Sequence, residues 1–153
     1  MRTGFYRDMW SKVLCETAVS AWWSSGAAEP LNLSKKYLTS VLHTDYLFTL
    51  RELDLSHNNL TNLLGFGSLL LLHKLNISHN KLSSLQGLEA CKNLDELDAS
   101  GNVIQNACGI LPCTKCRIRT LTLEGNPLSR SEVYPGCVLD SFVMLCTLDG
   151  KDL

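Results

Sequence analysis

The strongest constraint in this sequence is one pattern of apolar residues that recurs at nearly constant spacing. The pattern Leu-x-x-Leu-x-Leu-x-x-Asn-x-Leu begins at Leu50 and returns, with Ile or Ala in some places, at Leu72, Leu94 and Ile118. A degenerate copy begins at Ala28, so successive copies are separated by 22, 22, 22 and 24 residues. Such a period is typical of a solenoid, in which each copy forms one coil and the coils stack.

The chemistry of one copy predicts the structure of a coil. Its Leu-x-Leu centre alternates apolar and polar side chains, which indicates a short strand with one buried face. Stacked coils bury a continuous core and align these strands in a parallel sheet. The return segments carry Val41, Leu63, Leu85 and Ala107 at matching positions, and have room only for a short helix or 3₁₀ turn. We therefore predict an α/β, right-handed solenoid of about five coils with a parallel concave sheet.

The ninth position of the pattern is asparagine in every copy but the first, which has Lys36. An asparagine amide can bond backbone groups that the ladder leaves unsatisfied where the chain turns out of the strand. An atypical residue at this position is expected of a terminal repeat. The predicted structural asparagine column consists of Asn58, Asn80, Asn102 and Asn126.

Both ends of a solenoid need caps. Apolar residues from Trp10 to Trp22 fall at helical spacing, which predicts an amphipathic helix over residues 7–23. Residues 1–27 are thus interpreted as a capping helix or as the remnant of a preceding helical domain. Residues 28–150 are expected to form the repeat domain, ending in a short closing helix and a final turn.

Charge and hydropathy exclude several classes of protein. The 14 Lys and Arg residues nearly balance the 15 Asp and Glu residues, which argues against nucleic-acid or membrane-surface binding. The first ten residues lack the apolar core of a secretory signal, and the longest apolar run is too short to span a bilayer. We therefore expect a cytoplasmic protein, with a nuclear or ciliary location as alternatives, and reduced thiols at its seven cysteines.

The repeats and the end of the chain resemble a known class. The C-terminal motif reads Asn126-Pro127-Leu128 … Tyr134 … Val138-Leu139 … Leu148-Asp149-Gly150. Together with the 22-residue period, it is similar to the SDS22-like class of leucine-rich-repeat proteins with their C-terminal cap. This resemblance covers roughly residues 28–150. It implies a non-catalytic, intracellular protein-interaction module, because members of the class include phosphatase regulators, a spliceosomal subunit, axonemal dynein light chains and tubulin-folding factors.

A narrower resemblance involves the segment that precedes the repeats. Residues 6–19 (YRDMWSKVLCETAV), followed by residues 31–39 (LNLSKKYLT), look like the junction before the C-terminal leucine-rich-repeat domain of Rab geranylgeranyltransferase α subunits. The resemblance implies an accessory role in Rab prenylation, with the prenyltransferase β subunit or the Rab escort machinery as partner. The zinc and prenyl-diphosphate sites of that family belong to the β subunit, so no catalytic residue is carried over. The alternative is a free-standing SDS22-like scaffold, such as a phosphatase-1 regulator or an axonemal, dynein-associated subunit.

The candidate binding site is the concave face, where the outward-pointing strand residues of successive coils form rows. Ser34, Ser56, Ser78, Ser100 and Thr120 are also expected to point outward from this face. The alternative interpretation is a solvated face that keeps the solenoid soluble. The residues proposed to contact another protein are Asn32, Lys35, Arg51, Glu52, Asp54, His57, Lys74, Asn76, His79, Glu96, Asp98, Arg119, Thr122 and Glu124.

Two patterns raise the question of a metal. His57 and His79 occupy the same place in adjacent copies, but the pattern supplies no third ligand. Cys108, Cys113 and Cys116 have the spacing of a plant-type two-iron ferredoxin, with Cys146 thirty residues later. Cysteine is also a small apolar filler of solenoid cores, and these three lie in one return segment. We therefore expect no metal, no cofactor and no catalytic site.

Overall fold

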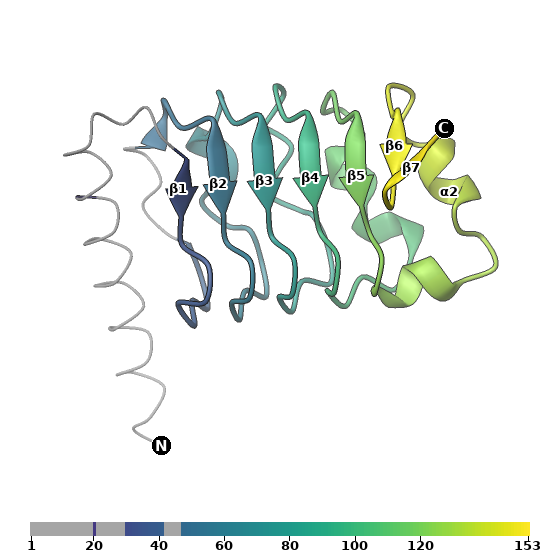
Figure 1. The fold of residues 1–153 in the computed structure, drawn as a ribbon, viewed down its shortest axis with the longest axis horizontal. Helices are drawn as coiled ribbons and strands as arrows, with labels where there is room; N and C mark the ends of the chain where they lie inside the picture. Colours follow the sequence, from purple (N-terminus) through teal and green to yellow (C-terminus); the bar gives the residue numbers. More distant parts are fainter. Residues whose placement is uncertain (1–19, 21–29, 42–46) are drawn as a thin grey trace, which may run out of the picture.

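The computed structural model describes Ser20, residues 30–41 and residues 47–153 (Figure 1). The helix predicted over residues 7–23 lies, apart from Ser20, outside the described residues. In the described part of the chain, successive coils stack along one axis, with the strands side by side in chain order. Short helical turns lie behind the sheet, and helix α2 lies at its C-terminal edge (Figure 1).

One sheet of seven short strands runs through the described residues in the order β1 to β7. The strands are β1 (Leu31–Asn32), β2 (Glu52–Asp54), β3 (Lys74–Asn76), β4 (Glu96–Asp98), β5 (Thr120–Thr122), β6 (Thr147–Leu148) and β7 (Lys151–Asp152). The strands β1 to β6 pair in parallel, as a stack of coils running in one direction requires. This arrangement confirms the predicted solenoid with a parallel sheet.

The register of the sheet places the central leucines in one line. Leu31 pairs with Leu53, which pairs with Leu75, and the line continues to Leu97 and Leu121. Since side chains alternate between the faces of a strand, this line points inward and its neighbours on each strand point outward. All five leucines are buried, so the period of the sequence sets both the register and the buried face.

In the described part of the chain, the return segments contain only short helical turns, as the coil length predicts. These are η2 (Phe66–Ser68), η3 (Ala107–Gly109), η4 (Leu111–Cys113), η5 (Pro127–Arg130) and α2 (Gly136–Leu139). The 24-residue copy holds two consecutive turns, η3 and η4, in the return between β4 and β5. Val41, Leu63 and Leu85 are buried at their matching positions. Ala107, at the matching position of the longer return, is only half-buried.

The core is a continuous band of buried leucine, isoleucine and cysteine, and Phe66 is its largest fully buried side chain. Burying one leucine stabilises a fold by about 1.5–3 kcal/mol, and each coil repeats this several times. No coil could retain this burial alone, because its neighbours cover both of its flat sides.

The asparagine column lies at the edge where the chain leaves each strand. The Asn80 amide donates to the carbonyl oxygens of Leu55 and Ile77, both at 3.0 Å, and its Oδ1 accepts the N–H of Leu60 at 2.9 Å. Asn58, Asn102 and Asn126 repeat this arrangement in their own coils, and all four side chains are buried. Each amide therefore joins two adjacent coils through backbone groups that the sheet does not pair.

The C-terminal cap contains one strand more than the sequence predicts. β7 turns back through Asp149 and Gly150 and pairs antiparallel with β6, whereas only a final turn was expected. Both turn residues have positive φ, 51° and 75°, which is the geometry of a tight hairpin. The predicted parallel sheet is thus completed by one antiparallel pair.

Candidate protein-binding face

The outward-pointing strand residues form two rows across the sheet. The first row consists of Glu52, Lys74, Glu96 and Thr120, which are in register with one another. The second row consists of Asn32, Asp54, Asn76, Asp98 and Thr122, also in register. Neighbouring strands lie about 4.8 Å apart, so every member of a row stands beside the next one. Residues from both rows line a hollow of about 310 Å³ that extends from Pro30 to Thr122.

The side chains of the second row are held by the backbone that follows each strand. Asp98 Oδ1 accepts hydrogen bonds from the N–H of Ser100 at 3.0 Å and from its hydroxyl at 2.7 Å. Asn76 is held in the same way by Ser78, and Asp54 Oδ1 accepts the Ser56 N–H at 2.9 Å. Such local turns fix a short polar side chain in one orientation. The second row is therefore a rigid set of acceptors.

These turns also correct one expectation about the serines. Ser56 and Ser78, which were expected to point outward, are only 6% and 5% exposed. Their N–H groups donate back to the residue two places earlier, on the second row. The alternation of a strand ends at this point, so the outward position predicted by period 2 does not extend to these serines.

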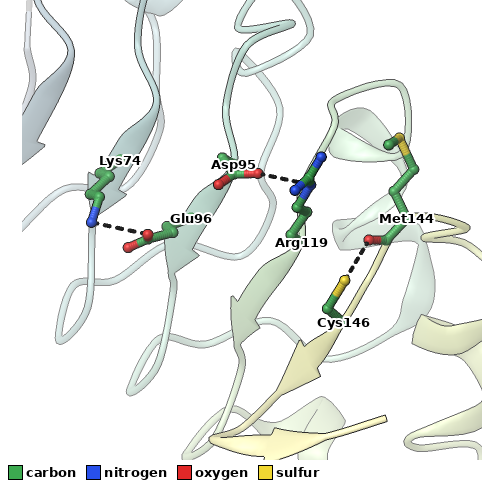
Figure 2. A network of polar contacts seen from close by, with 6 residues as sticks. All are labelled: Lys74, Asp95, Glu96, Arg119, Met144 and Cys146. Carbon is green, nitrogen blue, oxygen red and sulfur yellow. Dashed lines mark hydrogen bonds and ion pairs between the residues drawn. The ribbon is translucent and has the colours of Figure 1, made fainter.

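The first row contains an ion pair. Lys74 Nζ lies 3.0 Å from Glu96 Oε1 across the β3–β4 pair (Figure 2). The hydrogen bond and the negative charge of Glu96 raise the pKa of Lys74 above its ordinary value. Because both side chains remain about half exposed, this pair is screened by solvent and sets the charge pattern of the face more than its stability.

A second ion pair lies just before the strands, and the sequence analysis missed one of its members. Arg119 Nε lies 3.5 Å from Asp95 Oδ1, which comes from the neighbouring coil (Figure 2). Arg119 was predicted as a basic residue flanking the face, but Asp95 was not singled out. The repeat pattern indicated that Asp95 and Arg119 are neighbours, because Asp95 occupies in its copy the position that Arg119 occupies in the next.

The two histidines lie at the edge where the chain leaves β2 and β3. The His57 and His79 rings stack with centroids 4.4 Å apart and an angle of 11° between their planes. Both residues have positive φ, and Gly101 takes the same conformation in the next coil. A Cβ atom on Gly101 would stand 2.7 Å from His79 Nδ1, so the ring lies against the glycine backbone. In the part of the chain that the structure describes, no three His, Cys, Asp or Glu side chains are grouped as a metal site would require.

The remaining predicted face residues surround the two rows. Lys35, His57, His79 and Glu124 are exposed beyond the strand ends, and Arg51 is exposed just before β2. Glu52, Asp54, Asn76, Glu96, Asp98 and Thr122 are half-buried within the face itself. The structure therefore brings Glu52, Asp54, Glu96 and Asp98 together on the strands, with Lys74 between the two glutamates, and leaves Glu124 at the edge.

The cysteines of the ferredoxin-like spacing do not converge. Cys108 and Cys146 are exposed, and the Cys146 thiol donates to the Met144 carbonyl at 3.6 Å (Figure 2). Cys113 and Cys116 are buried in the core with Cys91. The described cysteines are free thiols. The spacing of Cys113 and Cys116 reflects their packing in the core.

Comparison with known proteins agrees with this geometry. The family model for the Leucine Rich Repeat matches residues 49–69. The structure of the Drosophila melanogaster SNF/U2A′ complex contains a chain 25% identical to this one, with a TM-score of 0.73, over 81% of this chain and 74% of that one. An internalin C2 from Listeria monocytogenes is 27% identical with a TM-score of 0.68, over 85% of this chain and 54% of the internalin.

No curated protein is significantly similar to the chain. Among the described residues, no helix has the length and apolar character needed to cross a bilayer. One conclusion follows from the seven-stranded, mostly parallel sheet, from the stacked coils and from the solved structures that resemble this chain. The chain has the fold of a leucine-rich-repeat solenoid, the architecture of a protein-interaction module.

Proposed function

We propose that this chain is a non-catalytic module that binds a partner protein on its concave face. The observation that carries the proposal is the second row, whose acceptors are fixed by hydrogen bonds to Ser56, Ser78 and Ser100 over an open hollow. A partner that docks on side chains already held in place does not have to order them, which lowers the entropic cost of binding.

The finer assignment is an accessory role in Rab prenylation in the cytoplasm. It is supported by the resemblance of residues 6–19 and 31–39 to the junction in Rab geranylgeranyltransferase α subunits. In this role the chain would contact the prenyltransferase β subunit or the Rab escort protein and leave the chemistry to that complex.

A free-standing scaffold or regulator is the second candidate, and one comparison is compatible with it. The Drosophila structure that covers 81% of this chain was solved as a complex, so a chain of similar fold is found there in an assembly. A phosphatase-1 regulator or an axonemal, dynein-associated subunit would use the same face in the same manner.

Direct titration of purified proteins separates these candidates. The full chain is titrated by calorimetry into the prenyltransferase β subunit, the Rab escort protein and the phosphatase-1 catalytic subunit. Saturable binding to either of the first two supports the accessory role, and binding to the phosphatase supports the scaffold. Binding to none of the three contradicts the role in Rab prenylation and the role as a phosphatase-1 regulator.

A matched pair of variants tests the face itself. The double variant Asp54→Ala, Asp98→Ala removes two acceptors of the second row, whereas Asp140→Ala removes an exposed carboxylate next to α2. We expect the double variant alone to weaken binding. An affinity that the double variant leaves unchanged would show that the partner binds elsewhere on the solenoid.

A further inference from the structure

Two cysteines in the long return between β4 and β5 form a pair three residues apart. Cys113 ends the 3₁₀ helix η4, and the N–H of Cys116 donates to the Cys113 carbonyl at 2.9 Å. Three residues complete one 3₁₀ turn, so the two side chains project from the same side with Cα atoms about 6 Å apart. This separation lies within the range of roughly 4.4–6.8 Å over which a disulfide forms without backbone movement.

Each thiol shifts the pKa of the other. The sulfur atoms of Cys113 and Cys116 lie 3.8 Å and 3.4 Å from the carbonyl oxygens of Leu85 and Leu88, respectively. Cys113 is fully buried, whereas Cys116 is 7% exposed. Cys116 is therefore the more accessible residue of the pair.

The surroundings make the two thiols unequal. The hydrogen bond from Cys113, helped by the positive charge of Lys92, holds the pKa of Cys116 below its ordinary value. The same hydrogen bond, together with burial, raises the pKa of Cys113. A lowered pKa increases the fraction of thiolate, which is the nucleophilic form of cysteine.

The third core cysteine provides a contrast within the same structure. Burial raises the pKa of Cys91 to about 12, and its thiol donates to the Phe66 carbonyl at 3.7 Å. Cys91 thus remains a protonated filler of the core. Burial of a cysteine in this solenoid does not by itself produce a reactive thiol.

We propose that Cys113 and Cys116 form a reversible disulfide site that hydrogen peroxide oxidises and small dithiols reduce. The Cys116 thiolate attacks one peroxide oxygen, the O–O bond breaks, and the departing hydroxide takes up a proton to leave as water. Cys113 then gives up its proton, and its sulfur attacks the sulfenic sulfur of Cys116. The S–S bond forms as the S–O bond breaks, and the second hydroxide leaves with that proton as water.

The two electrons lost by the pair reduce one peroxide to two waters, and a dithiol returns them while becoming a disulfide itself. In a reducing compartment such a bond is transient, which suits a sensor better than a structural crosslink.

The sequence allows a direct test, because Lys115 lies between the two cysteines. Trypsin cleaves after Lys92, Lys115 and Arg117, so Cys116 leaves in a dipeptide with Arg117, and Cys113 leaves in the fragment 93–115. Cys108 is in that same fragment, so the experiment uses the full chain with the exposed Cys108 changed to serine. The protein is treated with peroxide, alkylated, digested and mapped by mass spectrometry.

We expect the dipeptide to be joined to fragment 93–115 by a bond that dithiothreitol removes. In Cys113→Ser, Cys116 should instead accumulate as a sulfenic acid that dimedone traps, while Cys91→Ser should form the disulfide as before. Linkage of the dipeptide to fragment 82–92, which carries Cys91, would overturn the proposal, and so would oxidation confined to Cys137 or Cys146. Circular dichroism checks the fold of each variant, and the mapping on the Cys108→Ser chain decides the matter if Cys113→Ser does not fold.

Discussion

The hydroxyl of Tyr134 donates a hydrogen bond to Oδ2 of Asp149, whose Oδ1 accepts the N–H of Leu123 at 2.7 Å. The carboxylate thus takes the place at the C-terminal edge that a backbone carbonyl oxygen takes in the preceding coils, where the Thr122 oxygen accepts the N–H of Ala99 at 2.9 Å. Tyr134 precedes α2, and Asp149 forms the β6–β7 turn, so one contact joins the two parts of the cap.

Removal of this contact should destabilise the C-terminal cap. Tyr134→Phe keeps the ring and loses a hydrogen bond to a carboxylate, for which we expect a loss of about 1–2 kcal/mol in the free energy of unfolding. Urea denaturation followed by circular dichroism measures it. Tyr37→Phe, at an exposed tyrosine, is the matched control and should change little. Equal losses in the two variants would contradict the role given to Tyr134.

Because of the same tyrosine, the stability of the fold should decrease at alkaline pH. Burial, followed by the hydrogen bond to Asp149 and its negative charge, raises the pKa of Tyr134. The folded state therefore favours the protonated phenol, and this stabilisation is complete below the unfolded pKa of about 10. It decreases as the pH rises above that value toward the folded pKa. Melting temperatures from pH 8 to 11 should fall more steeply for the wild type than for Tyr134→Phe, and parallel curves would show that Tyr134 is not responsible.

The asparagine column predicts a large effect from one buried amide. Asn80→Ala leaves the carbonyls of Leu55 and Ile77 and the N–H of Leu60 without their side-chain partner. We expect a loss of about 1–3 kcal/mol in unfolding free energy. Asn62→Ala, which removes an exposed asparagine in a return segment, serves as the comparison and should cost far less. A tolerated Asn80→Ala would mean that water replaces the amide.

The same substitution at two glycines in neighbouring returns should change the stability of the fold by very different amounts. A Cβ on Gly87 would stand 2.3 Å from the Leu63 carbonyl oxygen, and its φ of 110° suits only glycine. We expect Gly87→Ala to destabilise the fold by at least about 1–3 kcal/mol, since backbone atoms cannot turn aside as a side chain can. Gly67 has no atom within 4 Å of its Cβ position, so Gly67→Ala should be nearly neutral. Thermal melts compare them, and similar melting temperatures would refute the argument.

The period of the sequence predicts most of the solenoid because it specifies the fold repeatedly. Leu53, Leu75 and Leu97 occupy one position in consecutive copies, and that position fixes their register in the sheet. The cap is harder to predict because it occurs once. Leu148-Asp149-Gly150 was recognised as a turn, yet the Asp-Gly pair is also a hairpin signal, which would have indicated the antiparallel return of β7.

The candidate face was predictable in outline only. Alternation along a strand predicts that Glu52 and Asp54 share the outer face, but it does not determine where their side chains find partners. The pairing of Asp95 with Arg119 depends on side-chain conformations across coils, and the burial of Ser56 depends on a turn that ends the strand. The position of Cys116 one turn after Cys113 depends on the long return of the fourth copy, in which η4 ends at Cys113 and the chain turns once more.

The reversed direction of β7 also determines what this edge of the sheet can join. Each parallel coil offers its neighbour the same unfilled row of backbone donors and acceptors, so nothing within a coil limits growth of the stack or fusion with a second molecule. A further coil laid against β7 would meet a strand of opposite polarity that carries the charged side chains of Lys151 and Asp152. The hairpin therefore acts as a stop against end-to-end polymerisation at this edge, built from only a few residues.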